Sequence, residues 1–215
     1  MQRYILSWKF HNNSILLFGG KTETITDMGA YNRVLLKLSG EALAGEKHFG
    51  LCEENEREAL VEKLVELIRD FDGRMSTGFV GTPLILRVLS DNGRSDEAFD
   101  LLLQEKNPSW LFSVTHGATT IWEHWNGIRE DNTFWDAAMN SFNHYSLGSC
   151  VYWLYAYVLG IKRRGKGSFL ISPDFSNQLD YAKGRYEFDG GEVRVEWRYE
   201  SDEICLTVGV FGNAD

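Results

Sequence analysis

Residues 115–127 read T-H-G-A-T-T-I-W-E-H-W-N-G and set one carboxylate among tryptophans and histidines. Glu123 follows Trp122 and precedes His124 and Trp125. Indole rings are flat and amphipathic, so they stack on the C–H faces of a sugar ring or on a nucleobase. A carboxylate among them is one half of a glycosidase site, which a second carboxylate would complete. In the alternative interpretation, Trp122 and Trp125 anchor the core and Glu123 is a solvated surface acid.

Three motifs carry a resemblance to the bacterial alpha-L-rhamnosidases. Residues 118–125, A-T-T-I-W-E-H-W, resemble a late catalytic motif of that family, A-T-T-I-W-E-R-W, with His124 in place of its arginine. Upstream, S-T-G-F-V-G-T-P at 76–83 is similar to the family's helix-joining loop. Downstream, M-N-S-F-N-H-Y-S-L-G-S at 139–149 is similar to its M-N-S-F-N-H-Y-x-L-G-S. The resemblance extends from about residue 53 to residue 215.

This resemblance implies an inverting glycoside hydrolase that removes terminal alpha-L-rhamnosyl groups from rhamnose-containing glycosides. The motif match makes Glu123 the general base that activates water. The implied substrate-binding residues are His144, Trp122, Trp125, Trp110, Thr120 and Asn143. The family's general acid lies in a D-x-x-x-R-x-E-R run, which these residues lack. We therefore expect an incomplete catalytic fragment with little activity alone.

A second resemblance covers residues 29–51. The run Y-N-R-V-L-L-K-L-S-G-E-A-L-A-G at 31–45 resembles the N-terminal strand and loop of bacterial uridylate kinases. Lysine and glycine-rich backbone favour phosphate, and the resemblance implies nucleotide binding by Lys37, Ser39 and Gly40. The glycine-rich and acidic stretches that complete a kinase site do not follow in this sequence. In the alternative interpretation, residues 34–38 form one buried strand before a polar turn and bind no nucleotide. Two families that meet near Cys52 predict a chimeric reading frame, produced by a gene fusion, a rearrangement or an assembly artefact.

Hydrophobic periodicity predicts helices first and strands afterwards. A helix is expected over 53–70, with Leu60, Leu64, Leu67 and Ile68 on one face. Thr82 and Ser95 are expected to cap two further helices. Residues 137–160 read as a long buried helix, or as such a helix entered through a loop. The basic run at 162–167 reads as a solvated linker. Strands are expected at 169–171, 179–188, 193–199 and 204–210, with a turn at Asp189-Gly190-Gly191.

The expected fold class is α+β. Residues 1–52 form an N-terminal segment, part of it kinase-like. Short helices in series over 53–161 are typical of helical hairpins. By the resemblance they are part of an (α/α) six-hairpin toroid. Residues 162–215 are expected to form an antiparallel β-sandwich that stops early. The resemblance thus assigns residues 53–161 and residues 162–215 to two successive domains of one enzyme.

Composition narrows the function classes. The net charge of −9 disfavours nucleic acid and anionic membranes as partners. The three cysteines lie far apart without metal-ligand spacing, so we expect no metal site and a reduced, cytoplasmic setting. We also expect no cofactor. No apolar run is long enough to span a bilayer. Two other functions stay open: a noncatalytic sugar-binding module that keeps the aromatic pocket, and a nucleotide (UMP) kinase remnant.

Overall fold

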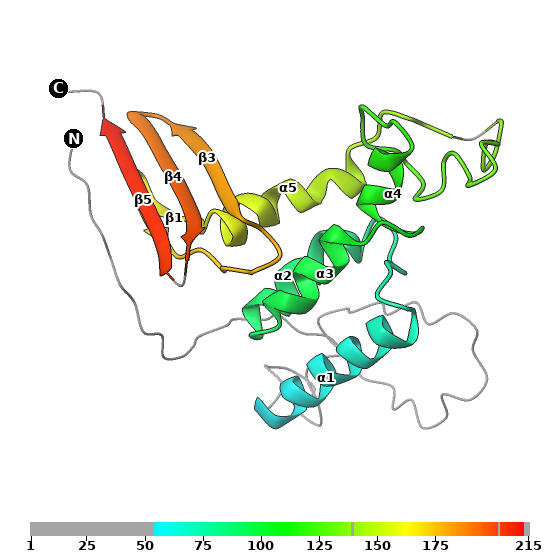
Figure 1. The fold of residues 1–215 in the computed structure, drawn as a ribbon, viewed down its shortest axis with the longest axis horizontal. Coiled ribbons are helices and arrows are strands. Elements are labelled where there is room, and N and C mark those ends of the chain that lie inside the picture. The colour runs from blue at the N-terminus through cyan, green and yellow to red at the C-terminus, as the bar shows by residue number, and fades with distance from the viewer. Residues whose placement is uncertain (1–53, 139, 202, 213–215) are drawn as a thin grey trace. The chain divides into compact units, whose positions relative to one another are not determined.

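The computed structural model describes residues 54–138, 140–201 and 203–212, which form two compact units (Figure 1). Residues 54–147 belong to the first unit, and the helices α1 to α4 lie in it. Residues from Gly148 onward belong to the second, and the strands β1 to β5 lie there. The nucleotide-binding residues expected at 37–40 lie outside the described residues. No helix in the described part of the chain combines the length and apolarity that a membrane crossing needs.

Helices α1 (Glu54–Asp70), α2 (Thr82–Asp91) and α3 (Ser95–Leu103) confirm the three helices predicted from periodicity. The buried face of α1 centres on Val61, Val65 and Ile68, at helical spacing. The predicted face was therefore shifted by one residue, and Leu60 is 42% exposed. Helices α2 and α3 form a hairpin and lie side by side (Figure 1).

The caps differ from the sequence expectation. Gly81 and Arg94, not Thr82 and Ser95, are the N-cap residues of α2 and α3. The Thr82 hydroxyl instead donates to the carbonyl of Gly78 at 2.8 Å, inside the loop that precedes α2. This threonine is 2% exposed, so its hydroxyl is used to hold the loop.

The long helix predicted over 137–160 is wrong. Residues 137–138 and 140–145 are irregular. They are followed by the 3₁₀ turn η2 (Ser146–Ser149), the single turn α5 (Cys150–Trp153) and the π-helical turn η3 (Leu154–Val158). Short polar side chains compete for the backbone here. The Asp136 carboxylate accepts from the amide of Ala138 at 2.7 Å, and the Ser141 hydroxyl accepts from the amide of Asn143 at 3.3 Å. The apolar content of residues 137–160 therefore predicted a longer helix than the one that forms.

The second unit carries two antiparallel sheets. Strand β1 (Ile161–Gly165) pairs with β2 (Ser168–Ile171), and β3 (Tyr181–Phe188), β4 (Gly191–Glu200) and β5 (Glu203–Gly212) follow in the order β3-β4-β5. The predicted turn at 189–191 is confirmed, with Gly190 at φ +107°. The predicted linker at 162–167 is wrong, because its basic residues form β1 and the turn to β2.

The two sheets share one apolar core. Phe169 of β2 contacts Phe188 of β3 with ring centroids 4.9 Å apart, and Val193 and Val195 of β4 are buried beneath them. Leu159 packs into the same core, directly against Gly184 of β3. The Trp197 indole is fully buried and donates to the carbonyl of Val158 at 2.6 Å. This packing of two small antiparallel sheets fits the expected β-sandwich.

Candidate active site

The carboxylate of Glu123 is held by the segment that contains the third motif. The amide of Glu123 donates to the carbonyl of Ser141 at 2.8 Å, and the amide of Ser141 donates back to the carboxylate oxygen Oε2 at 3.1 Å. The amide of His144 donates to the carbonyl of Ile121 at 2.8 Å. Two motifs that are separate in sequence are thus joined into one ladder that fixes both Glu123 and His144.

Further contacts tighten this ladder at both ends. The Thr120 hydroxyl donates to the carbonyl of Phe142. The Asn140 amide group donates to the carbonyl of Gly127 at 2.8 Å. Gly127 is buried, and a methyl group there would meet Asn140 Oδ1 at 3.1 Å and the Phe142 ring at 3.2 Å. A side chain at 127 would therefore push the two segments apart.

The three tryptophans predicted to line the site differ in exposure. Trp122 and Trp110 are 5% and 6% exposed, and their rings serve mainly as packing surfaces. Trp110 donates to the carbonyl of Leu147 at 2.7 Å. Trp125 is half-buried, meets Trp110 edge to face at 5.2 Å and donates to the carbonyl of Thr77 at 2.8 Å. Trp125 thereby links the Glu123 segment to the loop of residues 76–83.

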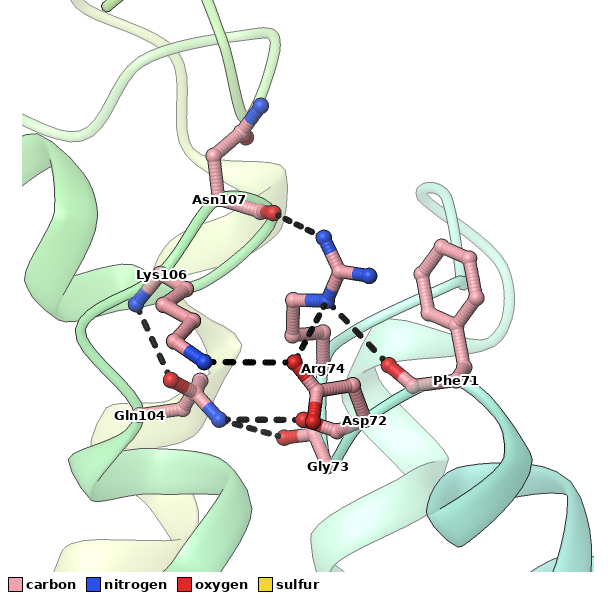
Figure 2. Close-up of polar contacts among 7 residues, drawn as sticks. All are labelled: Phe71, Asp72, Gly73, Arg74, Gln104, Lys106 and Asn107. Carbon is pink, nitrogen blue, oxygen red and sulfur yellow. Dashed lines mark hydrogen bonds and ion pairs between the residues drawn. The ribbon is translucent and has the colours of Figure 1, made fainter.

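Polar contacts outside the motifs position Trp110, which begins α4 (Trp110–Thr115). Figure 2 shows the turn after α1 joined to the segment after α3. The Arg74 guanidinium donates to the carbonyl of Asn107 at 3.1 Å, and the Gln104 amide group donates to the carbonyl of Gly73 at 3.2 Å. Because the Asn107 carbonyl lies three residues before the tryptophan, this network fixes where α4 starts.

His144 stands between two other rings. Phe79 stacks on it with centroids 4.7 Å apart and planes 15° apart, and Tyr145 lies on it at 5.2 Å and 16°. The amide of Ser146 donates a hydrogen bond to Nδ1 of His144 at 3.4 Å. In a neutral imidazole the other nitrogen, Nε2, then carries the hydrogen and is a donor. Asn143 is exposed beside it.

His124, the departure from the family motif, turns toward another aromatic residue. Its ring stacks on Trp135 with centroids 4.0 Å apart. Its Nε2 atom is buried, and no hydrogen-bond partner for it lies among the described residues. The side chain therefore behaves as a packing group where the family has a guanidinium.

The acids near Glu123 in sequence serve local turns. Asp131 accepts from the hydroxyl and the amide of Thr133, at 2.6 and 3.0 Å, and these bonds hold the pKa of the Asp131 carboxyl below its usual value. Asp136 accepts from the amide of Ala138. In residues 54–138, 140–201 and 203–212, no three His, Cys, Asp or Glu side chains gather to hold a metal ion.

Sequence reasoning missed several residues that build the site. Ser141 acts through its backbone, which no side-chain pattern reveals. Phe79 and Thr77 lie in the quoted 76–83 loop, but nothing in that loop indicates that it meets His144 and Trp125. Trp135 lies in a polar stretch, and only its bulk hints at its contact with His124.

Comparison with known proteins gives one family for this chain. The model of the bacterial alpha-L-rhamnosidase six-hairpin glycosidase domain matches residues 40–158, beginning inside the segment that resembles uridylate kinases. An alpha-L-rhamnosidase of Alteromonas sp. (strain LOR) is 37% identical over 164 residues, 75% of this chain and 18% of that protein. One of Streptomyces avermitilis is 40% identical over 156 residues, 72% of this chain and 15% of that protein.

Solved structures agree with these matches. The crystal structure of the Streptomyces avermitilis alpha-L-rhamnosidase complexed with L-rhamnose aligns with a TM-score of 0.70 at 38% identity, over 76% of this chain and 16% of that one. The native Aspergillus terreus enzyme aligns with a TM-score of 0.73 at 28% identity, over 76% and 19%. The chain thus spans less than a fifth of the length of each of these proteins.

Proposed function

Because this chain belongs to the bacterial alpha-L-rhamnosidase six-hairpin glycosidase family, we propose that it carries the water-activating side of an inverting rhamnosidase site. The observation that carries the proposal is the reciprocal bonding of Glu123 and Ser141. It orients one carboxylate oxygen toward the backbone and leaves the other for water. The same ladder holds His144, a hydrogen-bond donor, through the bond from its amide to the carbonyl of Ile121.

The chemistry follows from this arrangement. Oε1 of Glu123 takes a proton from a water molecule as that water attacks the anomeric carbon of the rhamnosyl group. The bond to the leaving oxygen breaks on the opposite face, and the configuration inverts. The leaving oxygen of an ordinary glycoside needs a proton, which a carboxylic acid about 6.5–9.5 Å from the base supplies in inverting enzymes. The family's run that carries this acid is absent from the sequence, so we expect alkyl rhamnosides to be poor substrates for this chain alone.

A substrate with a fluoride leaving group separates the two halves of this chemistry. Fluoride departs without protonation, so alpha-L-rhamnosyl fluoride needs a base but no acid. We expect the chain to release fluoride above the buffer rate, to leave methyl alpha-L-rhamnoside intact and to form the inverted anomer, seen by NMR.

Two variants test the assignment of the base. Glu123→Gln keeps the shape and the acceptor for the Ser141 amide but removes the base, and should abolish fluoride release. Glu130→Gln, an exposed glutamate of the same loop, is the matched control and should match the parent. Equal rates for Glu123→Gln and the parent would refute the proposal.

The two other candidate functions give different results. A noncatalytic sugar-binding module would bind L-rhamnose without releasing fluoride, and Glu123→Gln would not matter. A kinase remnant would bind UMP or ATP in a titration. The family match and the rhamnosidase relatives favour the hydrolase over both.

A further inference from the structure

The hairpin formed by β1 and β2 concentrates positive charge in a few residues. Residues 162–166 read K-R-R-G-K, so four of five positions are lysine or arginine. Lys162 is half-buried, and Arg163, Arg164 and Lys166 are exposed. None of these four side chains forms an ion pair with a carboxylate in the described part of the chain. The hairpin therefore carries charge that the described residues leave uncompensated.

The neighbouring sheet shows the opposite arrangement. Each lysine and arginine of β3 and β4 lies within 4 Å of a carboxylate oxygen. The Lys183 ammonium is 3.1 Å from Glu196, and the Arg198 guanidinium is 2.6 Å from Glu200. A cation with a carboxylate neighbour already has a partner for its N–H groups, whereas a cation without one can offer them to a ligand. The hairpin cations are therefore the available ones of the second unit.

These cations stand on a fixed scaffold. Ile161, at the start of β1, is 6% exposed and belongs to the apolar core. The ring of Phe169 in β2 contacts that of Tyr186 with centroids 5.7 Å apart. The amide of Ser172 donates to the carbonyl of Gly160 at 2.9 Å, which closes the base of the hairpin. Because the backbone is ordered before a ligand arrives, binding costs less conformational entropy.

The contacts that the cations make leave their charge accessible. The Lys162 ammonium lies over the Tyr157 ring, 4.3 Å from its centroid. Arg163 donates through Nε to the carbonyl of Gly165 at 3.2 Å, and its terminal nitrogens have no partner among the described residues. A guanidinium with free terminal nitrogens binds a carboxylate through two parallel hydrogen bonds. The hairpin thus fits a ligand that presents several carboxylates.

We propose that the β1–β2 hairpin, residues 161–171, anchors an acidic polysaccharide through the carboxylates of its uronate units. The choice of a glycan rests on the proposed function, since a terminal rhamnosyl group is part of a larger glycan. The net charge of −9 favours spaced carboxylates over nucleic acid, whose dense phosphates the acidic remainder of the chain repels. The hairpin contributes none of the candidate site residues, so it holds the polymer without taking part in bond cleavage.

Binding of the whole chain to immobilised polygalacturonate tests the anchor. The matched ligand is the fully methyl-esterified polymer, which has the same backbone without the charge. The parent should bind the acidic polymer, lose affinity as salt is raised, and leave the ester unbound. A triple variant, Arg163→Gln with Arg164→Gln and Lys166→Gln, removes three unpaired charges and should bind about tenfold more weakly.

A control variant of the same net charge separates the hairpin from overall charge. Lys183→Gln with Arg185→Gln and Arg198→Gln removes three cations that already have carboxylate partners. It should change the affinity by less than about twofold. The substituted side chains of both variants lie mostly in solvent, so both should melt as the parent does. The hairpin variant should also release fluoride from alpha-L-rhamnosyl fluoride at the parent rate.

The outcomes separate the anchor from the proposed function. Equal weakening in the two variants would assign binding to overall charge and overturn the anchor, as would equal binding of the methyl ester. Double-stranded DNA bound more tightly than polygalacturonate at the same salt concentration would overturn the choice of a glycan. Hairpin-dependent binding of polygalacturonate by a parent that releases no fluoride would support the anchor and count against Glu123 as the base.

Discussion

Replacing Gly184 with alanine tests how the second unit is packed. A methyl group at this position would lie under 3.0 Å from Cδ1 of Leu159, a separation that real Cβ atoms essentially never show, and 3.4 Å from Cγ and Cδ2. Leu159 is 6% exposed, and Val195, the partner of Gly184 in β4, is 1% exposed. Both side chains belong to the apolar core of the second unit. Gly184→Ala should therefore force the Leu159 side chain and the sheet apart.

The magnitude follows from two opposing terms. Overpacking a filled core costs about 1–3 kcal/mol. Alanine in place of a strand glycine returns about 0.5–1 kcal/mol, because glycine loses more backbone freedom on folding. We expect Gly184→Ala to lower the free energy of unfolding by about 1–2 kcal/mol on balance. Urea unfolding, followed by tryptophan fluorescence, measures it.

A double-mutant cycle isolates the clash. Leu159→Ala alone should cost about 2–5 kcal/mol by opening a cavity. In that background Gly184→Ala meets no obstacle and should be neutral or stabilising, which gives a coupling energy of about 2 kcal/mol. Gly165→Ala, in β1 with nothing within 4 Å of the added carbon, is the control. An equal cost of Gly184→Ala with leucine or alanine at 159 would refute the reasoning.

Three further predictions concern the site and the titrating groups. Trp125→Phe removes the bond to the carbonyl of Thr77 and should lower the free energy of unfolding by about 1–3 kcal/mol in urea, and an unchanged midpoint would contradict the link. Burial raises the pKa of Cys150 to about 11, so its alkylation, with the other cysteines replaced by serine, should accelerate up to pH 11 and not level off near pH 9. Asp131 should titrate by NMR below the usual aspartate pKa, and Thr133→Ala should move it upward.

Much of the fold could be predicted from the sequence because its signals are local. Helices α1 to α3 follow from apolar periodicity and from Pro83 and Gly93 at their ends, and β3 and β4 follow from strict alternation around a two-residue turn. The failures came where one signal had two explanations. The apolar run at 146–159 supports a 3₁₀ turn, a short α-turn and a π-turn in succession, and periodicity alone does not separate these from one helix.

The basic run at 162–167 failed for another reason. Only Ile161 at its start is buried, so its strand shows no alternation, and its pairing partner lies beyond the turn. For the site, the motif match indicated which side chains to consider. It did not indicate that the backbone of Ser141 holds Glu123 or that Trp110 would be buried, whereas the burial of Trp122 agrees with the alternative in which this residue anchors the core. Those facts depend on long-range contacts, which a single sequence does not encode in readable form.

The bond between Ser141 and Glu123 joins residues 18 positions apart and has a consequence for how this family can vary. Closing a flexible loop costs entropy that grows only with the logarithm of its length, about 0.6 kcal/mol for each doubling. Asn132, near the middle of the enclosed segment, is exposed and already in a left-handed turn at φ +61°. Insertions at that turn lengthen the loop without disturbing the ladder. The position of Glu123, the proposed base, therefore does not depend on the length of this loop. The loop beside the site can change in length and sequence while Glu123 stays in place.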